Sequence, residues 1–205
     1  MTFNTLADQS SLDTTVAALT AKNYQVLQVE NGAAALAEIK TLVPKGASVM
    51  NGSSVSLEQI GFVEYLKSGD HGWDNFHAKI LAETDKNKQA QLRKESLNSD
   101  YYLGSVHALM ENGDFLVASN TGSQLPHIAF TSPNLVFVVG TQKIVPGMAE
   151  ALQRLEEYVV PLEDKHMQQK YQVNTFLSKI LIFKGRSPFA NRNITFILVN
   201  EELGF

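Results

Sequence analysis

Hydrophobic positions in the first fifty residues change from helical to strand-like spacing and back again. Leu12, Val16 and Leu19 fall on one face of a helix, and the run YQVLQV alternates like a half-buried strand. A second helical run stops at Pro44. The predicted elements are a helix at 8–22, a strand at 24–29, a helix at 33–43 and a strand at 47–50. A β-α-β unit of this kind builds a parallel sheet covered by helices.

The next part of the pattern is helical but less regular. The run SLEQIGFVEYLKSG predicts a helix that is interrupted near Gly61 and ends at Gly69. Its candidate N-caps are Ser53, Ser54 and Ser56. A charged helix with few apolar positions follows at 84–97, where it suits a surface cover or an interface. The change of composition across 68–98 therefore predicts a helical cover beside the main domain.

Strand-like runs predominate from residue 100 onward. Asn112-Gly113 is a strong hairpin dipeptide between the runs 103–110 and 114–119. Further predicted elements are a helical turn at 124–130, a strand at 134–139, a helix from 148 to near Pro161, a polar helix at 163–178, and strands at 179–183 and 194–199. This order predicts one mixed, Rossmann-like three-layer α/β domain over residues 1–205.

Composition excludes several classes of protein and site. The chain has 205 residues and no cysteine, which excludes disulfides, thiolate nucleophiles and cysteine-ligated iron–sulfur clusters within it. A net charge of -4 argues against an electrostatically driven nucleic-acid surface. No run approaches the roughly 18 apolar residues of a membrane span, and the first residues lack the pattern of a secretory signal. We therefore expect no membrane or nucleic-acid partner and a cytoplasmic location.

Glycine-centred polar turns are the places where the sequence predicts chemistry. The turns at 120–124 and 140–143 each follow a strand-like run and precede a segment that can turn helical, as does the turn at 52–54. Backbone N–H groups at such turns can hold an anion. The sequence predicts a pocket for a small anionic metabolite. The predicted ligand-binding residues are Gly52, Ser53, Ser54, Asn120, Thr121, Gly122, Ser123, Gln124, Gly140, Thr141, Lys143, Arg186 and Arg192.

Each of these positions also has a plainer interpretation. The residues at 52–54 can be a helix cap and a tight turn, and Lys143 can be a solvated side chain at a strand end. Arg186 and Arg192 share one loop, where they can clamp an anion or simply face solvent. The turn at 120–124 is harder to explain as a connection, because it collects so many hydrogen-bond donors.

No motif assigns a reaction, since patterns such as GxGxxG, GxxxxGK[ST] and GxSxG are absent. The candidate catalytic residues are Lys143, which can stabilise negative charge, His127, which follows Pro126 near the 120–124 turn, and Glu58 as a base. Glu58 also suits the first turn of a helix for electrostatic reasons alone. Metal-competent side chains gather at Asp70, His71, Asp74 and His77, but their spacing matches no metal motif. We predict neither a metal site nor a cofactor.

The motifs together resemble a known family. VMNGSSVSLEQIGF at 49–62 resembles the G-S-S-x-T-L-x-x-x-G signature of the LUD domain, the domain of lactate-utilisation protein C and its relatives. Gly122 and the run GTQKIV at 140–145 are similar to that family's T-G-T turn and following strand end, and LVNEELGF at 198–205 resembles its L-V-x-x-x-L-G-F finish. The resemblance spans roughly residues 10–205. It implies a fold of the NagB/RpiA/CoA-transferase group and a role in lactate or related organic-acid oxidation.

Three functions remain open at this point. The first is binding of a small anionic metabolite, and the second is that of an accessory subunit that docks an iron–sulfur oxidoreductase through the 84–97 helix, since the resembled family works beside such a partner. The third is a sugar-phosphate isomerase or CoA-transferase-like enzyme. Asn120 stands where many members have Glu, and an amide cannot form the acyl anhydride of CoA transfer. Self-association into a homo-oligomer is compatible with each.

Overall fold

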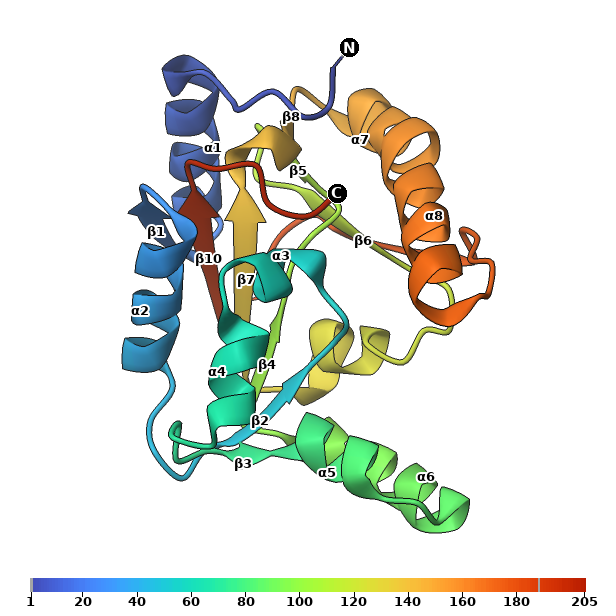
Figure 1. The fold of residues 1–205 in the computed structure, drawn as a ribbon. Helices are drawn as coiled ribbons and strands as arrows, with labels where there is room; N and C mark the ends of the chain where they lie inside the picture. Colours follow the sequence, from blue (N-terminus) through green and yellow to red (C-terminus); the bar gives the residue numbers. More distant parts are fainter. Residues whose placement is uncertain (1, 188) are drawn as a thin grey trace.

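The computed structural model describes residues 2–187 and 189–205, and a six-stranded parallel sheet runs through its centre (Figure 1). The strand order is β1-β10-β7-β4-β2-β3. The strands are β1 (Gln25–Val29), β10 (Asn193–Val199), β7 (Asn134–Gly140), β4 (Tyr101–Gly104), β2 (Ser48–Asn51) and β3 (Asp74–Asn75). All five pairings in the central sheet are parallel, and the predicted Rossmann-like, three-layer α/β class is confirmed.

A second, four-stranded sheet has the order β8-β5-β6-β9. Its strands are β8 (Ile144–Val145), β5 (Ala108–Met110), β6 (Phe115–Ser119) and β9 (Lys179–Phe183). The hairpin predicted at Asn112-Gly113 is confirmed, since it joins β5 and β6 and Gly113 has φ +76°. The single strand predicted at 103–110 is wrong, because the chain leaves the central sheet after Gly104 and enters the small sheet at Ala108.

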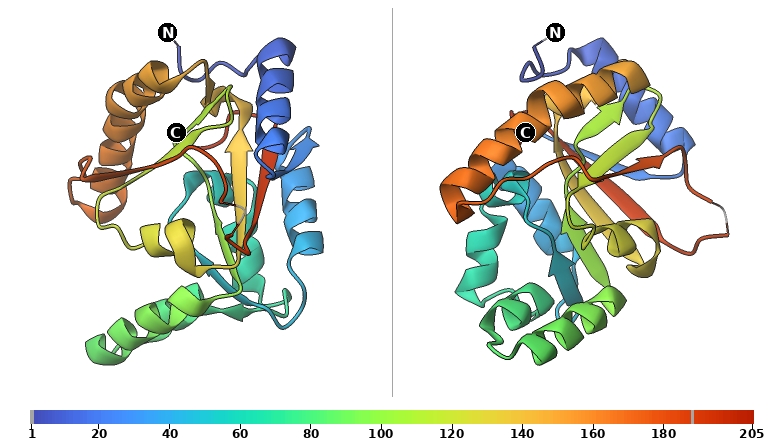
Figure 2. Two further views of the ribbon diagram at one scale, coloured as in Figure 1. Left: turned by 180° about the vertical axis from the view of Figure 1, so that it is seen from behind. Right: turned by 90° about the vertical axis from the view of Figure 1, so that its right-hand side faces the viewer.

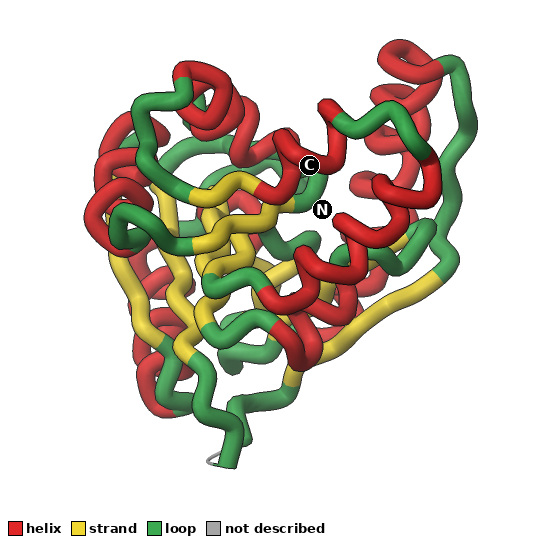
Figure 3. Tube along the Cα trace, turned by 90° about the horizontal axis from the view of Figure 1, so that it is seen from below, coloured by secondary structure: helices red, strands yellow, loops and turns green. Residues whose placement is uncertain are grey.

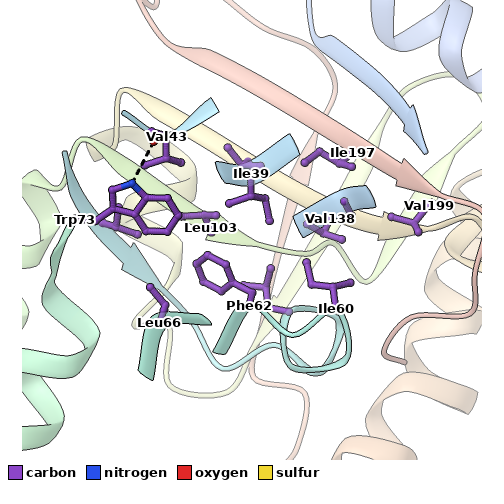
Figure 4. Packing of buried hydrophobic residues seen from close by; sticks show 14 of the residues in the cluster. Ile39, Val43, Ile60, Phe62, Leu66, Trp73, Leu103, Val138, Ile197 and Val199 are labelled. Carbon is purple, nitrogen blue, oxygen red and sulfur yellow. Dashed lines mark hydrogen bonds between the residues drawn. The ribbon is translucent and has the colours of Figure 1, made fainter. Parts of the chain in front are cut away.

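Helices α2 (Gly32–Leu42), α3 (Val55–Gln59) and α4 (Phe62–Ser68) cover one face of the central sheet. Gly61 (φ +80°) separates α3 from α4, and Gly69 (φ +76°) ends α4, as the sequence predicts. Phe62 and Trp73 lie within this layer, and Trp73 Nε1 donates to the carbonyl of Val43 at 3.1 Å (Figure 4). The polar edge of a large aromatic is thereby satisfied inside an apolar core.

Side chains of the central strands alternate between two separate cores. In β7, Val136 and Val138 pack against α2–α4, whereas Leu135, Phe137 and Val139 pack on the opposite face. That second face is covered by α1 (Gln9–Ala21) and by the small sheet. Because β7 is buried on both faces, its sequence NLVFVV is a nearly continuous apolar run.

The outer face of the small sheet carries a third core and a long helical segment. Helix α7 (Met148–Arg154), the π-helical turn η4 (Leu155–Val159) and α8 (Val160–Tyr171) form this segment, on the opposite side of the molecule from α2 (Figures 1 and 2). The predicted end near Pro161 is wrong. Pro161 lacks an N–H, and the wider π turn just before it absorbs the missing hydrogen bond, so the helix continues to Tyr171.

The segment predicted as a helical cover is largely helical. Helices α5 (Phe76–Ala82) and α6 (Lys86–Glu95) and the 3₁₀ turn η1 (Ser96–Asn98) follow β3 at the edge of the central sheet. Figure 3, seen from below, shows helices on both sides of the strands. None of the helices in the described part of the chain is long and apolar enough to cross a bilayer.

Candidate functional site

One cavity of about 360 Å³ lies where the two sheets, α3 and the α7–α8 segment meet. Residues 203–205 pass between α3 and α8 (Figures 1 and 2), and the last two of them line this cavity. Its polar lining comes from the turns after β2 and β6, from the β4–β5 connection and from Lys143. Its apolar lining includes Val106, Leu155, Val159, Val160, Met167, Phe176, Leu177 and Phe205.

Lys143 is the buried charge of the cavity. Its side chain is 3% exposed, and Nζ donates to Ser56 Oγ at 3.0 Å and to Ser105 Oγ at 3.2 Å. Among the described residues no carboxylate forms a salt bridge with it. Burial, and secondarily the positive charge of Arg154, lowers the pKa of Lys143 to about 7. The site therefore holds a cation that lacks a counter-charge.

The backbone around Lys143 is fixed by close packing with residues 201–204. Gln142 Nε2 donates to the carbonyl of Leu203 at 2.8 Å, and Ser56 Oγ donates to the same carbonyl at 3.2 Å. Gly204 (φ +66°) lies so near that a Cβ there would be 2.5 Å from Ser56 Oγ. The short 3₁₀ turn η3 (Thr141–Lys143) at the end of β7 then directs the lysine into the cavity.

Gly140 and Thr141 do not line the cavity, which corrects the predicted role of the 140–143 turn. A Cβ at Gly140 would be 2.5 Å from the carbonyl oxygen of Glu201 and 2.8 Å from the amide nitrogen of Leu203. Thr141 is buried behind the wall. Glycine at 140 is needed for the close approach of two backbone segments, and only Lys143 of this turn reaches the cavity.

The turn after β6 contributes Asn120, Thr121, Ser123 and Gln124 to the lining. Its donors are mostly engaged within the protein: Gly122 N donates to Ser119 Oγ at 2.9 Å, and Gln124 Nε2 donates to the carbonyl of Ala118 at 2.9 Å. Asn120 Nδ2 donates to Thr175 Oγ1 at 2.9 Å. Gly122 itself lies outside the lining. The turn therefore forms part of the cavity wall, and it does not present a group of free backbone N–H donors to a ligand.

The turn after β2, residues 52–54, both caps a helix and lines the cavity, so the two interpretations of this turn apply together. Ser54 caps α3, because its Oγ accepts from Leu57 N at 3.4 Å, and Gly52, Ser53 and Ser54 all line the cavity. A Cβ at Gly52 would be 2.6 Å from the hydroxyl of Tyr102, so glycine is required there. Glu58 also lines the cavity and is paired with Lys170 at 2.9 Å.

Three other predicted site residues lie elsewhere. His127 is buried, stacks on the ring of Tyr102 and shares a hydrogen bond of 3.1 Å with Ser132 Oγ, and burial lowers its pKa to about 4. Arg186 donates to the carbonyl of Asn23 at 3.1 Å. Arg192 is buried and donates to the carbonyls of residues 127, 128 and 132. Arg192 thus ends the π-helix η2 (His127–Thr131). None of the three residues lines the cavity, which corrects their predicted place in the pocket. Pro188, between these arginines, lies outside the described residues.

Replacing Arg192 with alanine is expected to lower the free energy of unfolding by about 2–3 kcal/mol, because three buried carbonyls lose a charged donor. Urea denaturation measures this. Arg186→Ala is the matched control, with an expected loss within about 1 kcal/mol for one exposed hydrogen bond. Equal losses in both variants would show that the three buried hydrogen bonds of Arg192 stabilise the fold no more than the one exposed hydrogen bond of Arg186.

Ser105 and His107 line the cavity from the β4–β5 connection. The position of His107 in a strand-like run is typical of a hydrogen-bonded core or pocket residue, whereas no sequence pattern marks Ser105. His107 Nδ1 accepts from Ala118 N at 3.1 Å, and burial, together with the charges of Lys143 and Arg154, lowers the pKa of His107 to about 3. The imidazole is therefore neutral, with its proton on Nε2.

Three of the four metal-competent side chains at 70–77 are engaged in other contacts. His71 Nδ1 accepts from Trp73 N at 2.9 Å, Asp74 pairs with Lys79, and His77 shares a hydrogen bond with Asn51 at 3.2 Å. Within residues 2–187 and 189–205, no group of three or more His, Asp or Glu side chains is arranged to hold a metal ion.

The turn after β2, Lys143 and residues 204–205 line the cavity and lie within the motifs that carry the family resemblance. The chain matches the LUD domain over residues 12–203. The chain belongs to the LUD domain family. The family as a whole is related to lactate utilisation, as the resemblance implied. Among curated proteins, none matches this sequence.

A solved structure resembles this LUD domain in fold. It is the crystal structure of a DUF162 family protein from Deinococcus radiodurans at 1.70 Å resolution, with a TM-score of 0.59 and 12% sequence identity. The match covers 96% of this chain and 100% of that chain. At this identity the likeness establishes the shared architecture, and the cavity has to be interpreted from the residues present here.

Proposed function

We propose that this LUD-domain protein binds a small organic carboxylate in the cavity, with Lys143 as its counter-charge, in the utilisation of lactate or a related organic acid. The observation that carries the proposal is the unpaired burial of Lys143. Its ammonium contacts two serine hydroxyls and no carboxylate among the described residues. A buried cation without a partner is costly, and a bound anion removes that cost.

The lining fits an organic anion better than an inorganic one. Ser105 and Ser56 lie beside Nζ and can share the recognition of carboxylate oxygens. The apolar part of the lining includes Leu155, Val159 and Met167 from the α7–α8 segment. A cavity of about 360 Å³ whose lining has both a buried cation and apolar side chains suits a carbon skeleton that ends in a carboxylate.

Isothermal titration calorimetry with lactate, pyruvate, longer 2-hydroxy and 2-oxo acids, and inorganic phosphate tests the proposal. We expect saturable binding of at least one carboxylate and weaker binding of phosphate, which has no carbon skeleton for the apolar part of the lining. No binding across the carboxylates, or binding of phosphate alone, would reject an organic-acid site.

The affinity for a carboxylate is expected to depend on pH through Lys143. Since burial lowers the pKa of Lys143 to about 7, the ammonium that binds the anion is present below that pH and is lost above it. The association constant should be level below about pH 6 and fall about tenfold per pH unit above pH 7. Calorimetry in buffers of different ionisation enthalpy measures the accompanying proton uptake. A level affinity up to pH 9 would show that Lys143 does not hold the ligand.

A further inference from the structure

Ser56, Ser105 and Lys143 form a closed cluster of three side chains. Lys143 Nζ lies 3.0 Å from Ser56 Oγ and 3.2 Å from Ser105 Oγ, and the two oxygens are 3.4 Å apart. The three residues come from α3, the β4–β5 connection and η3, so the cluster exists only in the folded protein. An amine within hydrogen-bond reach of a hydroxyl is the arrangement by which a base activates a serine nucleophile.

The hydrogen bonds give the two serines different roles. Ser56 has one hydroxyl proton, and the shorter of its two donations goes to the carbonyl of Leu203 at 3.2 Å. Ser56 therefore accepts a hydrogen bond from Nζ and holds the amine in place. The lone pair of a neutral Lys143 then remains for Ser105, whose hydroxyl can rotate from the Val106 carbonyl, 3.3 Å away, to Nζ, 3.2 Å away.

The two serines also differ in access to the cavity. Ser56 is 1% exposed, whereas Ser105 is half-buried, and both line the cavity. His107, two residues further on, is neutral and keeps an N–H donor on Nε2. Ser105 is thus the hydroxyl that combines a base with open space and a nearby donor for a carbonyl oxygen.

We propose that Ser105 is an acyl-accepting nucleophile, with Lys143 as its general base and Ser56 as a positioning residue, and that the substrate is a small ester or thioester. This goes beyond carboxylate binding, because it assigns a reaction to the cavity. It also differs from transfer through a carboxylate nucleophile, for which Asn120 is unsuited.

The proposed steps balance without a cofactor. The Ser105 proton moves to the neutral Nζ of Lys143 while Oγ forms a bond to the substrate carbonyl carbon. The bond to the leaving alcohol or thiol breaks, and the leaving group takes the proton from Lys143. Water then attacks the acyl-serine, gives its proton to Lys143, and releases the acid as Ser105 recovers its proton. The apolar lining from α7–α8 would hold the acyl chain.

Acylation and carboxylate binding need opposite states of Lys143, which allows them to be tested separately. Anion binding requires the ammonium and acylation requires the amine. Arg154 is the other charged basic group that acts on Lys143, and His107 beside it is neutral. The acidic groups of the lining, Glu58 and Glu163, are paired with Lys170 and His166. A bound carboxylate should therefore inhibit acylation.

The test is labelling of the full chain with an alkyl fluorophosphonate, followed by intact-mass measurement and peptide mapping. We expect one phosphonyl group on Ser105, with a labelling rate that rises about tenfold per pH unit towards pH 7 and levels off above it. Ser105→Ala and Lys143→Met should lose labelling at least about a hundredfold. Ser10→Ala, an exposed serine on α1, is the control and should label like the wild type.

Two further variants keep the test decisive. Since the chain has no cysteine, Ser105→Cys introduces a single thiol. The rate at which iodoacetamide alkylates this thiol should change with pH over the range in which Lys143 titrates. Lys143→Arg keeps a charge but cannot act as a base, so it should retain some carboxylate binding and lose labelling.

The acyl-transfer proposal would be overturned by labelling at a residue other than Ser105, by labelling that Lys143→Met does not affect, or by no labelling of the folded protein. Carboxylate binding would survive those results, and its own failure in calorimetry would leave Ser105 labelling untouched.

Discussion

Replacing Lys143 with methionine is expected to weaken carboxylate binding strongly and, at the same time, to stabilise the ligand-free protein. The side chains are similar in length and volume, but methionine carries no charge into a site where Lys143 is 3% exposed. Losing the counter-charge should weaken carboxylate binding by about a hundredfold or more. Removing a buried, unpaired cation should raise the free energy of unfolding by roughly 1–4 kcal/mol at neutral pH.

The stability gain has a predictable pH dependence. The pKa of Lys143 is lowered from 10.5 in an unperturbed chain to about 7 in the folded protein. Between these values the unfolded chain binds more protons than the folded one, so wild-type stability rises with pH. The advantage of Lys143→Met should therefore be largest below pH 7 and shrink towards pH 10.

Thermal unfolding and calorimetry on the same samples check both parts of this prediction. The matched control is Lys165→Met on α8, an exposed lysine outside the cavity lining, which should leave both binding and stability nearly unchanged. A variant that unfolds at a lower temperature than the wild type would mean that Lys143 is a net stabilising group. That result would remove the physical argument for an anion in the cavity.

Replacing Gly140 with alanine is expected to destabilise the fold by more than about 3 kcal/mol, although glycine to alanine is a small change. The added Cβ would lie 2.5 Å from the Glu201 carbonyl oxygen and 2.8 Å from the Leu203 nitrogen. Both are backbone atoms, so no side-chain rotation relieves the contact. The backbone at Gly140 has φ -65°, which alanine adopts freely, so the whole effect is steric.

Because residues 201–204 also hold Ser56 and Gln142 in place, Gly140→Ala should perturb the Lys143 cluster as well as the fold. Urea denaturation gives the stability loss, and the rate of Ser105 labelling reports the cluster. Gly185→Ala is the control, since nothing lies within 4 Å of its Cβ position, and its effect should stay within about 0.5 kcal/mol. Comparable losses in the two variants would refute the packing of Gly140 against residues 201–203.

The sequence anticipated parts of the site for the right physical reason. Lys143 and Ser54 were predicted from turns that follow strands, and both line the cavity. The carboxyl ends of β2 and β7 meet at one edge of a parallel sheet, so side chains just beyond them are brought together. The anion-binding role of these residues stays a prediction until a ligand is tested.

Other expectations failed where a residue's partner is distant in sequence. Arg192 is predicted either as a ligand clamp, through bidentate bonds, or as a solvated loop side chain, yet it is buried on the carbonyls of residues 127, 128 and 132. Pro161 was predicted to end a helix, and a π turn accommodates it. The strand predicted at 103–110 divides between two sheets, which an unbroken apolar run cannot reveal.

By itself, the sequence determined the α/β class, most element positions, the helix breaks at Gly61 and Gly69, and the absence of thiol chemistry. It left three candidate caps for α3, of which the structure shows Ser54. These depend on spacing, backbone conformation and residue type, which act over a few residues. Only the tertiary structure decided that Lys143 meets Ser56, 87 residues away, and Ser105, 38 residues away, in one cavity. Local periodicity specifies which face of an element is buried but not what it packs against, so the chemistry of this site follows from how the two sheets and α3 come together.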